Sequence, residues 1–193
     1  MLPRIKATLM QEGVSLDLST PSDWAGVQFK LNRIFKHKTM RVNFTTYDVR
    51  RAEDIINPRT RQSNIMVLNP EISTTTPSEA YPFWYARVLG IFHTNVVYMG
   101  QGNRNLHPRR MEFLWVRWYD LKKAGSWVPL RLDEVCFPRI IDEDSFGFLD
   151  PGDVLRVCHI IPCFRMGQVG SESQPGAEGI QDRHDWKVYY VNR

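Results

Sequence analysis

Several features that would assign the chain to a membrane, secreted or disulfide-rich class are missing from its 193 residues. No apolar run approaches the roughly 18–20 residues that a membrane-spanning helix requires. The N-terminal MLPRIKATLMQEG lacks the apolar region of a secretory signal. There are only three cysteines, Cys136, Cys158 and Cys163, and an odd number favours reduced, buried thiols over a disulfide framework. We therefore expect a soluble, intracellular protein.

Metal-binding and catalytic motifs are also scarce. Cys158, His159 and Cys163 lie close together in the sequence, but neighbouring residues of a strand point to opposite faces, so Cys158 and His159 should diverge. The acidic residues between 142 and 153 match no calcium-binding loop. No helix follows GQG (100–102), as a phosphate-binding loop would require. The sequence therefore predicts no catalytic residue, no metal and no cofactor. An enzyme that combines Cys158 or His159 with the 142–153 acids is the weakest hypothesis.

Helical periodicity is absent as well. No stretch of about 12 residues repeats its apolar positions with the 3.6-residue period of a helix, and only DPGDVLRV (150–157) is expected to form a helical turn. Alternating apolar and polar residues instead predict half-buried strands at 27–35 and 39–49, separated by a hairpin-length gap. Residues 83–92 and 111–121 are apolar on both alternating faces, which is typical of central strands covered on two sides. Further strands are expected at 65–68, 95–99, 127–135, 154–164 and 186–192.

These segments predict a mostly β fold, either a rolled antiparallel sheet or a small SH3-like barrel, with long loops and at most short helical turns. Residues 1–26 are expected to form an irregular N-terminal arm. Residues 27–193 should form a single β-rich domain, with a mobile loop at 167–185.

Positive charge is concentrated in one part of the chain. The formal net charge is only +4, yet the segment from Lys30 to Arg61 holds nine basic and three acidic residues. That segment alone carries +6, nine minus three, which leaves −2 for the remainder. Clustered basic side chains bind polyanions by counterion release. A solvated basic face without a ligand is the alternative. The nucleic-acid-binding residues predicted here are Lys36, Lys38, Arg41, Arg50, Arg51, Arg59 and Arg61.

Aromatic residues gather on the two central strands. Trp84 and Tyr85 lie on the first of them, and Trp118 and Tyr119 lie on the second. Such a group could form a cage for a methylated ammonium group or a platform on which bases stack. Packing in the core is the alternative, because adjacent residues of a strand face opposite ways.

Five blocks of the sequence carry a resemblance to a known family. They are NRIFKHKTMRVNFTTYDVRRAEDIINPRTRQSNIMVL (32–68), YPFWYARVLGIFHTNV (81–96), MEFLWVRWYD (111–120), FGFLDPGDVLRVCHIIPCF (146–164) and DWKVYYVNR (185–193). Together they resemble the conserved C-terminal region of Plavaka-type transposon proteins of basidiomycete fungi. The resemblance implies a non-catalytic accessory region downstream of the transposase nuclease, located in the nucleus. The family pattern continues past YYVNR, which implies that the chain is a fragment or a shortened form.

A second resemblance is more local. FWYARVLGIF (83–92), followed by VRWYDL (116–121), is similar to a strand pair of bromo-adjacent homology (BAH) domains. These are chromatin readers built on a rolled β-barrel, so the similarity implies an SH3/BAH-like fold. Two functions are therefore expected. The first is a module that contacts DNA or chromatin through its basic segment. The second is a structural or protein-interaction domain that binds other transposase domains without binding nucleic acid.

Overall fold

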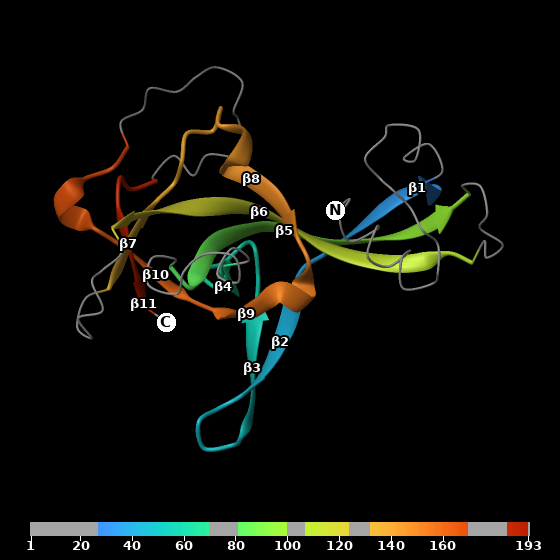
Figure 1. Ribbon diagram of the computed structural model, residues 1–193, viewed down its shortest axis with the longest axis horizontal. Helices are drawn as coiled ribbons and strands as arrows, with labels where there is room; N and C mark the ends of the chain where they lie inside the picture. Colours follow the sequence, from blue (N-terminus) through green and yellow to red (C-terminus); the bar gives the residue numbers. More distant parts are fainter. Residues whose placement is uncertain (1–26, 70–80, 100–106, 124–131, 170–184, 193) are drawn as a thin grey trace.

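The computed structural model describes residues 27–69, 81–99, 107–123, 132–169 and 185–192 (Figure 1). The expected arm at 1–26, the first part of the expected strand at 127–135, and residues 170–184 of the expected loop lie outside the described residues. Within the described ranges, no helix has the length and apolar character of a membrane span. The helical segments found there are three short 3-10 turns, η2 (Glu143–Ser145), η3 (Pro151–Asp153) and η4 (Phe164–Met166). The strands are β1 (Val27–His37), β2 (Met40–Thr45), β3 (Arg51–Ile56), β4 (Asn64–Leu68), β5 (Phe83–Tyr98), β6 (Arg109–Lys123), β7 (Asp133–Cys136), β8 (Phe146–Leu149), β9 (Val154–Val157), β10 (His159–Pro162) and β11 (Tyr189–Asn192).

Strands β5 and β6 form the axis of the fold. They pair antiparallel along most of their length, with a shift of register between Val88 and Gly90. A bulge of this kind bends a strand and increases its twist. On one side of the bulge, β4 and β7 extend the sheet into the body of the molecule. On the other side, β1 pairs with β5 to complete a three-stranded arm, which extends from the body (Figure 1).

The sheet is rolled because a single residue connects its two edges. The strand order is β10-β11-β7-β6-β5-β4-β9, and only Cys158 separates β9, at one edge, from β10, at the other. Cys158 is buried, and its N–H donates a hydrogen bond to the carbonyl of Asn64 (3.0 Å). The described strands pair antiparallel, and no ladder joins β9 to β10, so the sheet stays open. The predicted mostly β fold is confirmed.

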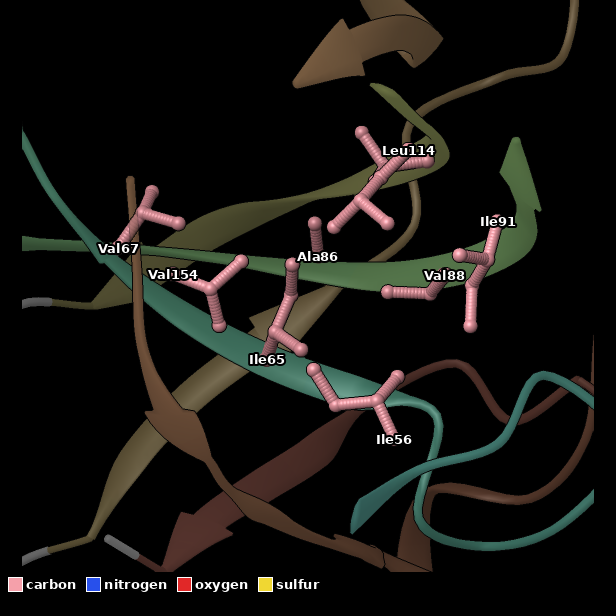
Figure 2. Close-up of a cluster of buried hydrophobic side chains, with 9 residues drawn as sticks. Ile56, Ile65, Val67, Ala86, Val88, Ile91, Leu114 and Val154 are labelled. Carbon is pink, nitrogen blue, oxygen red and sulfur yellow. The ribbon is translucent and has the colours of Figure 1, made fainter. Parts of the chain in front are cut away.

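Both faces of β5 and β6 are buried, as their doubly apolar sequences predict. Figure 2 shows the cluster on one face, formed by Ile56, Ile65, Val67, Ala86, Val88, Ile91, Leu114, Val116 and Val154. The buried members of the cluster on the opposite face are Tyr85, Tyr119, Val135, Cys158, Tyr189 and Val191. Met40 and Val42 of β2 pack against the first cluster. The base of the β2–β3 pair is therefore anchored in the core.

The pairing of the first two strands differs from the prediction. Segments 27–35 and 39–49 do not form a hairpin with each other, because β1 pairs with β5 while β2 pairs with β3. The predicted strand 39–49 ends at Thr45, and the strand that follows it, β3, was not predicted. The reason is a tight turn at residues 46–50, inside a segment rich in β-forming residues. Alternation alone does not reveal where such a segment reverses direction.

Other strand boundaries also differ from the prediction, and β11, for example, begins at Tyr189 rather than at 186. The expected strands at 83–92 and 95–99 are one continuous strand, β5, because β6 and β1 pair with it through the polar residues between them. The expected strand at 154–164 is split at Cys158 into β9 and β10, which have different partners. The expected helical turn near Pro151 is present as η3.

A histidine pair joins β1 to β5 in the arm. His37 Nε2 lies 2.5 Å from His93 Nδ1, and the ring of Phe35 stacks on His93 with 4.7 Å between ring centroids. The pKa of His93 lies below its usual value because its surroundings desolvate it. The positive charges of Arg110 and His37 add to this effect, whereas Glu112 opposes it. The neutral form of His93 is therefore the one that the folded arm favours.

This preference predicts a pH-dependent stability of the chain. The folded state binds fewer protons at His93 than the unfolded state does at pH values near and below the ordinary pKa of 6.5. The free energy of unfolding should therefore fall as the pH drops through that value. A His93→Gln variant should lose this part of the pH dependence, measured as the difference between the two chains in urea unfolding at pH 7.5 and about 5.5. Identical pH profiles for both chains would contradict the assignment.

Candidate nucleic-acid interface

The β2–β3 hairpin projects from the body as a two-stranded ribbon (Figure 1). Six residue pairs hold it together, from Met40↔Ile56 at the base to Thr45↔Arg51 near the tip. With about 3.3 Å per residue, the ribbon is about 20 Å long. The alternation of its sequence turns Met40, Val42 and Phe44 toward the body, while the residues between them are exposed. The ribbon therefore has one supported face and one free face.

Asp54 attaches the supported face to β9. Its carboxylate accepts a hydrogen bond from the Val157 N–H (3.1 Å) and lies 3.3 Å from Arg156 Nε. The guanidinium of Arg156 also lies over the Phe44 ring, 3.8 Å from its centroid. A charge-assisted hydrogen bond and a cation–π contact thus meet on one arginine. These contacts fix the angle at which the ribbon leaves the body.

The tip of the ribbon is a closed turn at residues 46–50. The Thr46 N–H donates to the Arg50 carbonyl (2.8 Å), and the Val49 N–H donates to the Thr46 carbonyl (2.9 Å). The Arg50 N–H donates to the Thr46 hydroxyl (3.1 Å), and Arg50 pairs with Asp48 (2.8 Å). The Tyr47 and Val49 side chains take no part in this network and are almost entirely exposed. The turn is therefore held by its backbone and its polar side chains.

All nine basic residues between 30 and 61 are exposed. Asp54, by contrast, has a mostly buried carboxylate, with 18% of its side chain exposed, and it is paired with Arg156. Arg41 pairs with Glu53 at 3.5 Å and Arg50 pairs with Asp48, both at the surface. The other seven of the nine basic residues, nine minus two, have no acidic partner among the described residues. They are Lys30, Arg33, Lys36, Lys38, Arg51, Arg59 and Arg61.

The predicted binding residues gather near the base of the ribbon and at its tip. Lys36 and Lys38 precede β2, and Arg59 and Arg61 follow β3, so both pairs flank the ends that meet at the base. Arg41 lies one residue into β2, while Arg50 and Arg51 lie at the tip. The structure thus places these charges near both ends of the ribbon.

The four predicted aromatic residues lie on two faces of the sheet. Trp84 and Trp118 meet edge to face, with 5.8 Å between ring centroids, and Trp84 is 37% exposed. Tyr85 and Tyr119 are buried on the opposite face. Tyr85 donates a hydrogen bond to Asp133 (2.9 Å), and burial raises the pKa of its hydroxyl. The four side chains therefore do not line one common surface.

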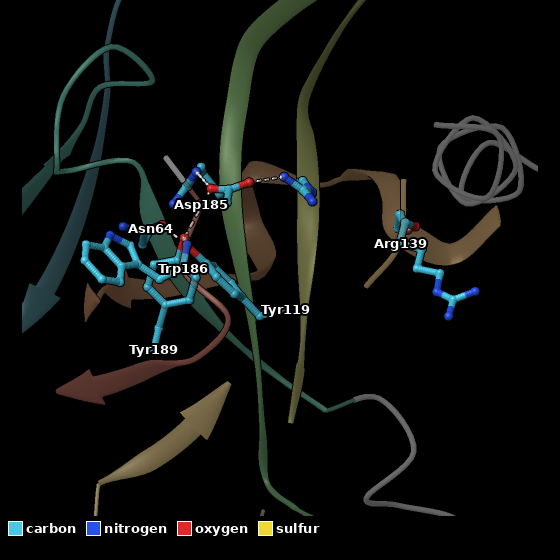
Figure 3. A network of polar contacts seen from close by, with 9 residues as sticks. Asn64, Tyr119, Arg139, Asp185, Trp186 and Tyr189 are labelled. Atoms are coloured by element: carbon cyan, nitrogen blue, oxygen red, sulfur yellow. Dashed lines mark hydrogen bonds and ion pairs between the residues drawn. The ribbon is translucent and has the colours of Figure 1, made fainter. Parts of the chain in front are cut away.

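A buried polar network lies beside Tyr119 (Figure 3). The Asp185 carboxylate pairs with Arg117 at 2.8 Å and with Arg87 at 3.2 Å, and it accepts a hydrogen bond from the Tyr189 hydroxyl (3.1 Å). Both guanidinium groups lie over the Phe137 ring, at 3.9 Å for Arg117 and 4.6 Å for Arg87. The Phe137 ring on this face is thus covered by two arginine side chains of the chain itself. The network joins the last strand to β5 and β6.

The cysteines do not resemble an activated nucleophile. Burial raises the pKa of the Cys158 thiol to about 12, so the thiol stays protonated at neutral pH, whereas the thiolate is the reactive form. Cys158, between β9 and β10, is buried, and His159, the first residue of β10, is exposed, so the two side chains diverge. In the part of the chain that the structure describes, no group of three or more His, Cys, Asp or Glu side chains could hold a metal ion.

Two features of the ribbon were not found from the sequence. Tyr47 and Val49 lie within the predicted strand 39–49, where they are ordinary β-forming residues. Asp54 appears in the sequence only as one acid that lowers the local charge. The alternation in RAEDII (51–56) is the signal from which β3 could have been inferred.

Comparisons with protein-family models, with curated proteins and with solved structures found no match.

The Asp185 network predicts a large difference between buried and exposed ion pairs. Asp185→Asn leaves two mostly buried guanidinium groups without their shared carboxylate, which should lower the free energy of unfolding by about 3 kcal/mol. The matched control is Asp48→Asn at the ribbon tip, where both partners are more than half exposed and the expected loss is about 0–1 kcal/mol. Urea unfolding of both variants measures the difference. Equal losses would mean that the buried network does not stabilise the C-terminal segment.

Proposed function

We propose that this chain is a non-catalytic binding module that contacts DNA through the β2–β3 ribbon and the basic residues around its base. The observation that carries the proposal is the exposure of all nine basic side chains between 30 and 61, seven of them without an acidic partner among the described residues. Cations that make no internal ion pair are free to exchange their counterions for phosphate groups. A polyanion is therefore the partner that this surface favours.

The shape of the ribbon supports duplex DNA as that polyanion. Two-stranded β-ribbons of DNA-binding proteins lie in the major groove of B-DNA, which is about 12 Å wide, or in its minor groove. The ribbon of this chain is joined to the body on one face only, and its ends are flanked by Lys36, Lys38, Arg59 and Arg61. With the ribbon in a groove, the basic residues at its base would lie toward the phosphates that border the groove. Phosphate contacts of this kind position a protein without reading sequence.

The resemblance of the sequence to Plavaka-type transposon proteins supports the same role. An accessory region that holds DNA for a nuclease elsewhere in the protein would have no need of a catalytic centre of its own. A nuclear location and partners among other transposase domains are parts of this proposal. The exposed Trp84–Trp118 edge is proposed as a second contact with the ligand, because a partly exposed indole can stack on a base.

The proposal predicts a strong dependence of DNA binding on salt. Fluorescence anisotropy with a labelled duplex should give an affinity that falls steeply between about 50 and 200 mM salt. Reversing four charges that have no acidic partner among the described residues, in the variant Lys38→Glu/Arg51→Glu/Arg59→Glu/Arg61→Glu, should abolish most of the binding. It should also reduce the slope of log K against log salt by roughly one for each phosphate that the variant no longer neutralises.

A second quadruple variant is the matched control for net charge. Lys122→Glu/Arg139→Glu/Arg165→Glu/Lys187→Glu changes the total charge by the same amount at exposed positions outside the 30–61 segment. It should retain more affinity and a salt slope closer to that of the wild type. Equal losses of affinity in the two variants would mean that the total charge of the chain, and not the position of the charges, explains the binding. No binding of the wild-type chain at low salt would overturn the proposal and favour a protein-interaction domain.

A further inference from the structure

The tip of the ribbon combines two features that the stability of the fold does not explain. The first is exposure: Tyr47 is 106% exposed and Val49 is 82% exposed. The second is strain, because Val49 has a φ of 61°, in the left-handed region. A β-branched residue with a positive φ is a genuine outlier. Its exposed side chain has little packing against the body to offset that cost.

The two features together indicate a contact outside the chain. Glycine or asparagine would adopt the conformation of Val49 with less strain, so the turn itself does not require valine. Strained residues are often found where a protein binds its ligand. The hydrogen bonds and the ion pair of the turn use the backbone, Thr46, Asp48 and Arg50. The two apolar side chains are thus presented by a turn that holds its shape without them.

The charge around the tip favours one partner. Arg50 and Arg51 directly follow the apolar pair, and Asp48 is the acid within the turn, so residues 46–51 carry +1, two minus one. Proteins that insert apolar side chains between base steps do so from the minor groove, where they combine them with arginine and lysine side chains. The tip also lies at the far end of a projecting ribbon, which is the part that would enter a groove first.

We propose that the tip of the β2–β3 ribbon is a wedge that inserts Tyr47 and Val49 into the minor groove of duplex DNA and unstacks a base step. This inference rests on the proposed function. Tyr47 supplies a ring that stacks on an exposed base, and Val49 fills the space beside it. Arg51, which pairs across the strands with Thr45, lies where it can approach the adjacent phosphate.

The test uses the full chain and a duplex with 2-aminopurine at a central step and a dye pair at its ends. Binding of the wild-type chain should increase the 2-aminopurine fluorescence and bring the two ends closer by energy transfer. The double variant Tyr47→Ala/Val49→Gly should bind roughly 5- to 100-fold more weakly, the range expected for the loss of one stacked base. It should give neither signal when saturated. Its salt slope should stay that of the wild type, because the basic residues that neutralise phosphates are unchanged.

Two controls separate the wedge from a structural role. Val49→Gly alone should leave the melting temperature equal to or above that of the wild type, because it removes the strain, while it weakens DNA binding. Ile141→Ala removes another exposed apolar side chain and should leave binding unchanged. A lowered melting temperature for Val49→Gly, with affinity reduced in proportion, would overturn the wedge.

The outcomes also distinguish this inference from the proposed function. If the double variant binds with the affinity and signals of the wild type, the wedge is wrong, while DNA binding through the basic residues stands. If the wild-type chain binds no duplex even at low salt, the proposed function fails, and the wedge fails with it.

Discussion

The antiparallel pairing of β5 with β6 is the interaction on which the rest of the structure depends. These two strands run through both the body and the arm, and each of their faces carries its own buried cluster. β4 and β7 extend the pair on either side in the body, while β1 adds to β5 in the arm. Because both faces are covered, most of the apolar surface that folding buries lies within or against this pair. A weaker ladder at this position would leave the other strands without a surface to pack on.

The rolled sheet explains how a ribbon can project without weakening the core. Cys158 connects β9 at one edge to β10 at the other, so the two edges of the sheet lie one residue apart along the chain. The Asp185 network then holds the last strand against β5 and β6. The ribbon is attached outside this roll, through Met40, Val42 and Asp54. Its free face can therefore change in sequence, or contact a partner, at little cost to the rest of the fold.

Much of the fold was predictable because apolar residues recur in the sequence at the spacing of buried strand positions. The doubly apolar segments 83–92 and 111–121 are central strands, and the Pro-Gly turn at 151–153 is where DPGD places it. The predictions failed where a partner far along the chain decides the outcome. Nothing within 27–35 indicates that its partner is β5 rather than β2, because pairing depends on which edges the folded sheet leaves open. The turn at 46–50 was hidden for a related reason, since Thr, Tyr and Val favour strands by propensity alone.

The candidate site also combines features that the local sequence determines with features that depend on distant parts of the chain. The sequence by itself determined the composition of the chain, the concentration of basic residues between 30 and 61, and the alternation that makes β2 and β3 strands. These are local properties, set by residue type and spacing. Only the tertiary structure decided that Tyr85 and Tyr119 are buried while Trp84 remains partly exposed, because the face of a strand that meets solvent depends on what packs against it. It also decided that Asp54 turns inward to Arg156 and that Tyr47 and Val49 stand at a free tip. The contact of Asp54 with Arg156 joins residues about a hundred positions apart in the chain, and no local pattern encodes it.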